Sequence, residues 1–205
     1  MPDELENYRI QFEAIKLDAH TLLAEVTLPQ LVWRSHAESW SIADCLNHLV
    51  VTGNESLPRI RAALAGRHSR KSFGVHAFLQ ATVGNLLIRW MDAPPKIRFK
   101  APKAYRPTPN LPVDKIVDDF FYLQEEIISC LNESRGFDLA RIKVSNPVST
   151  WLKLSLGQEF ALAAAHERRH LWQARRVREK AESSAAGAIQ QSVRPEPPPA
   201  SFSSN

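Results

Sequence analysis

Apolar residues recur at intervals of three and four through most of the chain, which is the pattern of amphipathic helices. This recurrence predicts helices over residues 4–26, 42–64, 74–92, 113–134 and 157–181. We find no series of alternating apolar and polar residues of the kind that makes sheets, and no Gly-rich phosphate loop. The sequence therefore predicts an all-α fold, a bundle of four or five helices.

Residues that start and stop helices divide the pattern. Pro29 is expected to end the first helix, whereas Ser41 is expected to cap the second, with Asp44 three residues on as in a capping box. Residues 96–112 contain several prolines and are long enough for a crossover rather than a tight turn. Residues 137–156 are expected to form an irregular link before the last helix.

The end of the chain differs in composition from the rest. From residue 183 onward it is rich in Ser, Pro and Ala and offers little to bury. We therefore expect one helical domain over residues 1–182 and a disordered tail over residues 183–205.

Composition excludes several classes of protein. Two cysteines, Cys45 and Cys130, make no disulfide framework in 205 residues, and the acidic start of the chain is no signal peptide, so we expect a cytoplasmic protein. The apolar runs are too short for a membrane span. The net charge is +4, with many cations between Arg168 and Lys180. Either they complement a helix C-terminus or they form an anion-binding patch, and without a nucleic-acid motif we expect no nucleic-acid partner.

The most informative residues are His166 and His170. They are four residues apart in a predicted helix, so both imidazoles leave the same face one turn apart. Small residues precede the pair, which favours an inward orientation. Two buried imidazoles need partners, and a shared divalent metal ion would satisfy both.

A metal site needs further ligands, and His48 in the second predicted helix is the best candidate for the third. The alternative for His48 is a hydrogen-bonded structural histidine. Three imidazoles with one open position suit zinc, and nickel also accepts imidazole ligands. The other histidines lack a spacing partner and are expected at the surface; they are His20, His36, His68 and His76.

Several residues near these histidines have two interpretations. Glu55 follows His48 by seven residues and Glu159 precedes His166 by seven, so each shares a helix face with its histidine and is a candidate catalytic base or orienting group; the alternative is an ordinary exposed glutamate. Cys45 is either a fourth ligand or a core residue.

Residues 166–170 also match the His-Glu-x-x-His motif of zinc proteases, in which Glu167 would be the general base. Such proteases use a third ligand downstream, and here only Glu179 and Glu182 follow before the tail. The chain also lacks strands that could align a peptide. We therefore expect Glu167 to face solvent or to support a ligand from outside the first coordination sphere.

Two segments together resemble the DinB-like family: Trp40 to Leu49, and His166 to Ala174. The linker residues 99–103 and 146–147 are similar to those of its members, and the resemblance extends over about residues 5–180. It implies a four-helix bundle with a long crossover connection, often dimeric. It also implies a divalent metal ion held by His48, His166 and His170. Relatives include bacillithiol transferases and mycothiol-dependent maleylpyruvate isomerase.

Three functions follow from these observations. The first is a metal-dependent enzyme, a transferase or hydrolase, in which zinc or nickel activates a low-molecular-weight thiol or water toward a small-molecule substrate. The second is a non-catalytic, metal-binding, stress-related interaction module. The third is a structural domain with incidental histidines. We expect a homodimer without nucleic-acid or membrane partners.

Overall fold

The fold is described by a computed structural model that covers residues 3–66, 75–95, 100–145 and 153–192. Side chains are described for these residues except 75–78 and 187–192. Within this part of the chain the structure is mostly helical, as predicted. Its elements are α1 (Glu4–Ala24), α2 (Leu28–Val32), α3 (Ile42–Gly66), α4 (Val75–Met91), the 3-10 turn η1 (Lys103–Tyr105), α5 (Val113–Glu133), β1 (Lys143–Ser145), β2 (Lys153–Ser155) and α6 (Leu156–Ser192).

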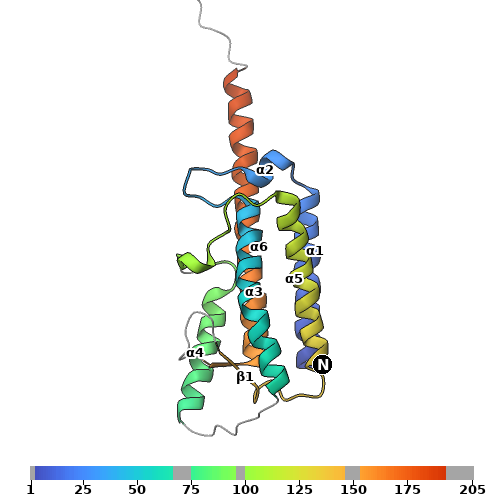
Figure 1. The fold of residues 1–205 in the computed structure, drawn as a ribbon. Coiled ribbons are helices and arrows are strands. Elements are labelled where there is room, and N and C mark those ends of the chain that lie inside the picture. Colours follow the sequence, from blue (N-terminus) through green and yellow to red (C-terminus); the bar gives the residue numbers. More distant parts are fainter. Residues whose placement is uncertain (1–2, 67–74, 96–99, 146–152, 193–205) are drawn as a thin grey trace, which may run out of the picture.

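Four long helices, α1, α3, α5 and α6, form the bundle. In Figure 1, α1 and α6 run in one direction and α3 and α5 run in the other. Because α3 and α5 are parallel neighbours, the chain must return along the bundle between them, and it does so through α4 and η1. The predicted four-helix bundle with a long crossover is therefore correct, and the crossover includes α4, which packs on α6 and β2 beside the bundle.

The core lies between the four bundle helices. Three phenylalanines, Phe12 of α1, Phe120 of α5 and Phe160 of α6, are fully buried there. Aliphatic residues of α3, such as Leu46 and Leu49, complete the same cluster. Burial of a side chain of this size contributes about 1.5 to 3 kcal/mol. The faces predicted from the apolar periodicity therefore meet in one core.

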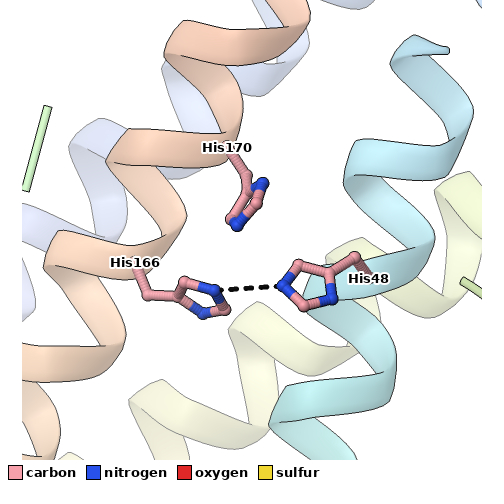
Figure 2. A group of neighbouring side chains, drawn as sticks. All are labelled: His48, His166 and His170. Atoms are coloured by element: carbon pink, nitrogen blue, oxygen red, sulfur yellow. Dashed lines mark hydrogen bonds between the residues drawn. The ribbon is translucent and has the colours of Figure 1, made fainter. Parts of the chain in front are cut away.

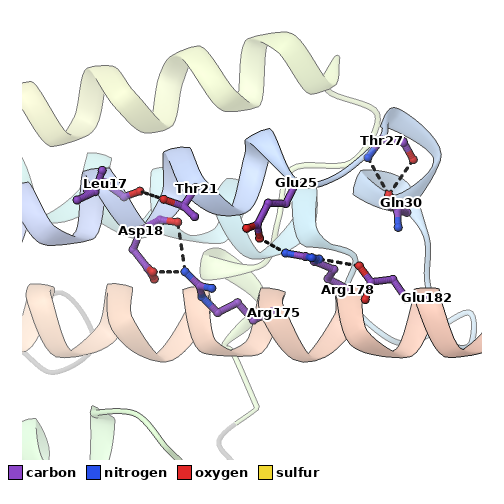
Figure 3. A network of polar contacts seen from close by, with 9 residues as sticks. All are labelled: Leu17, Asp18, Thr21, Glu25, Thr27, Gln30, Arg175, Arg178 and Glu182. Atoms are coloured by element: carbon purple, nitrogen blue, oxygen red, sulfur yellow. Dashed lines mark hydrogen bonds and ion pairs between the residues drawn. The ribbon is translucent and has the colours of Figure 1, made fainter.

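Ion pairs join α1 to α6 along the outside of the core (Figure 3). Arg175 pairs with Asp18, and Arg178 bridges Glu25, the residue that caps the end of α1, and Glu182 of its own helix. Arg168 clamps Asp92, at the end of α4, with bonds of 2.8 and 2.9 Å. These arginines lie far from the C-terminus of α6, which is at Ser192. The prediction that they complement the dipole at the end of that helix is therefore wrong.

The last helix is longer than predicted. α6 continues to Ser192 and projects past the other helices in Figure 1, so residues 183–192 are helical rather than the start of a disordered tail. Residues 193–205 lie outside the described residues. Alanine-containing sequence has high intrinsic helix propensity, which lets a preformed helix propagate without a core to bury.

Two shorter elements also differ from expectation. Pro29 does not end α1, which stops at Ala24. It lies in the first turn of α2, where a missing N–H costs nothing, between the capping-box residues Thr27 and Gln30. The link over 137–156 contains an antiparallel strand pair, in which Val144 lies opposite Leu154 and both are buried. In the described part of the chain, no helix has both the length and the apolar character needed to cross a membrane.

The close approach of α3 to α5 generates a prediction about Gly53. A Cβ at this position would lie 2.5 Å from both Cδ atoms of the buried Leu123 and 3.0 Å from its Cγ. Gly53→Ala should therefore lower the free energy of unfolding by about 1 to 2 kcal/mol, although alanine favours helices. In a Leu123→Ala background the same change should raise it by up to about 1 kcal/mol. Urea unfolding followed by circular dichroism measures both.

Gly66→Ala is the control, because the space around that Cβ is open. Equal effects of Gly53→Ala in the two backgrounds would contradict the proposed contact between the helices.

Candidate metal centre

Helix α6 presents His166 and His170 on one face, as the spacing predicts. The alanines just before them are fully buried at Ala164 and Ala165, which lets α6 approach its neighbours closely. His170 is 7% exposed and lies against the ring of His166, with centroids 4.7 Å apart. The predicted inward orientation of the pair is therefore confirmed.

Helix α3 supplies the third imidazole. Its first turn is fixed by the predicted capping box: the Ser41 N–H donates to Asp44 Oδ2 at 2.8 Å, and the Asp44 N–H donates to Ser41 Oγ at 3.1 Å. His48 follows one turn later and is 4% exposed. The capped start of α3 thus determines where the His48 ring enters the bundle.

The three rings converge on one point between α3 and α6 (Figure 2). One ring nitrogen from each residue can be chosen so that all three lie within 4.8 Å of one another. The Nε2 atoms of His48 and His166 are 3.1 Å apart. Two imidazoles on one zinc ion, at bonds of 2.0 to 2.1 Å and a tetrahedral angle, would place their nitrogens about 3.3 Å apart. The observed separation is close to that value.

The crossover segment orients His48. The carbonyl oxygen of Tyr105 accepts a hydrogen bond from Nδ1 of His48 at 2.5 Å, and the side-chain amide of Asn47 donates to the Thr108 carbonyl at 2.8 Å. Because a carbonyl can only accept, the proton of neutral His48 is on Nδ1, and Nε2 carries a lone pair toward His166. Such a bond on the outer nitrogen is typical of histidines that bind metals.

Burial keeps all three imidazoles neutral. It is the main cause that lowers the pKa of His48, lowers that of His166 to about 3 and brings that of His170 well below its ordinary value. The mutual repulsion of the rings adds to the effect at His166 and His170. Neutral imidazoles offer lone pairs, so the site is ready to bind a cation near pH 7 without first losing protons.

The donor set fits a divalent transition-metal ion. Imidazole nitrogens suit zinc and nickel, whereas magnesium and calcium prefer oxygen. In addition, Nδ1 of His170 is buried and makes no hydrogen bond among the described residues. The nearby side chain of Gln173 raises the pKa of His170, but by less than burial lowers it. Cys45 is fully buried in the apolar core, and its sulfur does not converge with the three histidine nitrogens. It is therefore a core residue rather than a fourth ligand.

Comparison with known families agrees with this geometry. The model of the DinB superfamily matches residues 11–174, which include all three histidines. This chain belongs to the DinB superfamily. No curated protein matches it, and no solved structure does. The DinB-like resemblance drawn from the two histidine segments is thereby confirmed, and the fold of the bundle with its His48, His166 and His170 triad is consistent with a divalent metal site.

Two buried acids lie on α6 of this DinB-superfamily chain. Glu167 is buried, so its predicted position at the solvent side is wrong; burial raises its pKa to about 8. The fully buried Gln124 of α5 opposes this rise, but neither its amide atoms nor Oε2 of Glu167 complete a hydrogen bond among the described residues. The downstream acids of the protease motif, Glu179 and Glu182, instead pair with arginines of α6.

The two candidate catalytic glutamates lie in different environments. Glu55 is exposed on α3, where Arg59 contacts it at 3.5 Å. Glu159 is 3% exposed in the first turn of α6, and burial raises its pKa to about 7, against the opposing effects of Ser56 and Arg59. The other histidines behave as expected where described: His20 and His36 are exposed, whereas His68 and the side chain of His76 lie outside the described residues.

A cavity of about 1120 Å³ connects the triad to solvent and reaches Glu159. Its wall includes all three histidines, the Trp40 ring 4.8 Å from that of His48, and residues of the crossover. The residues that sequence reasoning missed are Trp40 and Tyr105, which touch the triad without carrying any spacing signal of their own.

The environment of Glu159 generates a prediction about stability. Its pKa is raised in the folded protein, so its carboxyl stabilises the fold fully below pH 4.5, and this contribution is lost as the pH rises through 7. The free energy of unfolding of Glu159→Gln minus that of the wild type should therefore increase by about 2 to 3 kcal/mol from pH 4.5 to pH 8. Urea unfolding of chelator-treated protein at both pH values measures the change.

Glu55→Gln is the matched control, because that carboxyl is exposed and its variant should keep a constant difference from the wild type. A Glu159→Gln difference that does not change with pH would contradict a buried, proton-holding carboxyl.

Proposed function

We propose that this protein is a metal-dependent enzyme that uses a divalent ion, zinc or nickel, to activate a thiol or water for transfer to, or hydrolysis of, a small molecule. One observation carries the proposal: three neutral imidazoles converge at the wall of a cavity. Three protein ligands with a further position left for a small molecule are the arrangement of catalytic rather than structural zinc sites.

Different residues around the site would bind the ion, orient its ligands and shield them from water. His48, His166 and His170 would hold the ion, and the Tyr105 carbonyl keeps the His48 ring oriented. A bound ion would lower the pKa of a thiol or water and so supply a nucleophile near pH 7. Trp40 lies against the rings of His48 and His170, with centroids 4.8 and 5.6 Å apart, and shields that side of the triad from water.

Positive charge at the cavity supports a low-molecular-weight thiol as cosubstrate. Four exposed cations belong to its wall, namely Lys100, Arg106, Arg176 and Lys180. They would attract a thiol that carries carboxylates and raise its local concentration at the mouth. This is the anion-binding interpretation of the late basic residues, now limited to those that line the cavity.

The alternative function is a metal-binding interaction module without turnover. It needs the triad but gives no role to a cavity that extends beyond it, and for this reason we rank it second. The homodimer implied by the family is also carried forward as a proposal. The described surface that suits it is the row of half-exposed apolar side chains along α4, which comprises Leu79, Val83, Leu86 and Trp90.

Metal content tests the site directly. Tag-free protein loaded with zinc or nickel and then desalted should carry one ion per chain by elemental analysis, and its melting temperature should rise on loading. His170→Ala should lose most of the bound metal and the thermal shift, whereas the exposed His20→Ala should keep both. Absence of stoichiometric metal from the wild type, with no thermal shift for either ion, would end the proposal.

Turnover separates an enzyme from a binding module. Metal-loaded wild-type protein should accelerate transfer of low-molecular-weight thiols, or hydrolysis, across a panel of small electrophiles. His166→Ala should reduce the rate at least 100-fold because it removes a metal ligand. Arg176→Ala should raise KM for an anionic thiol several-fold while leaving kcat nearly unchanged. Stoichiometric metal with no activity on any member of the panel would favour the module.

A further inference from the structure

The cavity has two unlike halves on either side of the triad. Toward the C-terminal part of α6 its wall is exposed at Trp172, Arg176 and Lys180. Toward the start of α6 its wall is buried and apolar, with Leu57 and Ile60 of α3, Ile127 of α5 and Phe160 of α6. We call these four residues, together with Glu159, the inner half of the cavity. Along α6 it lies on the opposite side of the triad from Trp172, Arg176 and Lys180.

Glu159 is the polar feature of this inner half. The residue is 3% exposed, and its Oε2 atom is buried with no hydrogen-bond partner among the described residues. The carboxyl also interacts with Ser56 of α3 and, through its charge, with Arg59. A buried polar atom without a partner is destabilising, so a purely structural carboxyl would be expected to have both oxygens paired. An unpaired atom at a cavity wall has room for a partner that comes from a ligand.

The distance from Glu159 to the triad defines the size of that ligand. Glu159 precedes His166 by seven residues, so both lie on the same face of α6 and are separated by about 10 Å along its axis. Leu162 and Ala163, which lie between them on α6, line the cavity. A ligand whose reacting atom is at the triad can therefore reach Glu159 only with an extended body about eight carbon atoms long.

We propose that the inner half of the cavity binds an extended, uncharged substrate with an apolar body, and that Glu159 positions it through a hydrogen bond to an amide or hydroxyl at its far end. Burial raises the pKa of Glu159 to about 7, so a protonated carboxyl can donate as well as accept, which suits an amide. An anionic end would be disfavoured by the apolar walls and by the two buried glutamates, Glu159 and Glu167. This inference rests on the proposed function only in placing the reacting atom at the triad.

Hydroxamic acids of different tails test the proposal, because the hydroxamate binds the metal and the tail samples the cavity. Binding to nickel- or zinc-loaded protein is measured by calorimetry. Octanohydroxamic acid should bind about 100-fold more tightly than acetohydroxamic acid, since its additional methylenes enter the inner half. An eight-carbon hydroxamate ending in a primary amide should bind the wild type within about threefold of octanohydroxamic acid, because Glu159 compensates the buried amide.

Two substitutions identify Glu159 as the partner. In Glu159→Leu the amide-ended tail should lose about tenfold relative to the methyl-ended tail, whereas the exposed control Glu55→Leu should leave this ratio unchanged. Ala163→Phe places a large side chain in the cavity one turn before His166. It should abolish the higher affinity for long tails without changing the affinity for acetohydroxamic acid. If Glu159→Leu does not fold, the isosteric Glu159→Gln provides the measurement. An eight-carbon hydroxamate ending in a carboxylate should bind Glu159→Gln at least tenfold more tightly than it binds the wild type at pH 8.

The outcomes separate this inference from the proposed function. If acetohydroxamic acid binds but the longer tails gain nothing, or if the amide-to-methyl ratio is the same in wild type and Glu159→Leu, the inference is wrong and the metal site stands. If the protein takes up no metal, the proposed function fails. The inner half is then tested on metal-free protein by ligand-observed NMR, where octanediamide should bind the wild type and not Glu159→Leu; equal signals would overturn it.

Discussion

The packing of α3 against α6 is the constraint on which the rest of the site depends. The two helices run in opposite directions, so residues near the start of α3 lie beside the middle of α6, and His48 faces His166 and His170. On α6 the small residue that shares the face of His166 is Ala163, which lies one turn before it and lines the cavity.

Burial has opposite effects on the ionisable groups in this interior, and both effects favour binding chemistry. It lowers the pKa of the three histidines, so they remain neutral and keep their lone pairs. It raises the pKa of Glu159 and Glu167, so these acids can hold protons near neutral pH. Polar groups of this kind weaken an apolar core, and Gln124 beside Glu167 adds two more unpaired atoms. Stability is supplied instead mainly by the fully buried phenylalanines of the core, because exposed ion pairs such as that of Arg175 with Asp18 contribute little.

Much of the fold and the centre of the site could be predicted because both rest on local periodicity. The apolar spacing predicted the bundle helices to within a few residues except at the end of α6, and the interval between His166 and His170 placed both on one face. His48 could be named as a candidate third ligand from the sequence, but no local rule pairs residues 118 positions apart, and only the resemblance to the DinB-like family implied its pairing with His166. The burial of Glu167 was missed for a related reason: its neighbour on α5, Gln124, is specified by packing between helices rather than by spacing in either.

The extent of α6 was misjudged because composition and helix propensity disagree after residue 182. Few apolar residues there argued for disorder, whereas the helix needs only hydrogen bonds and alanine to continue. This helix also sets the distances on which the proposed chemistry depends. Glu159, His166, His170 and the exposed Arg176 all line the cavity from α6, so one rigid element fixes the separation of the inner half, the metal ligands and the basic mouth.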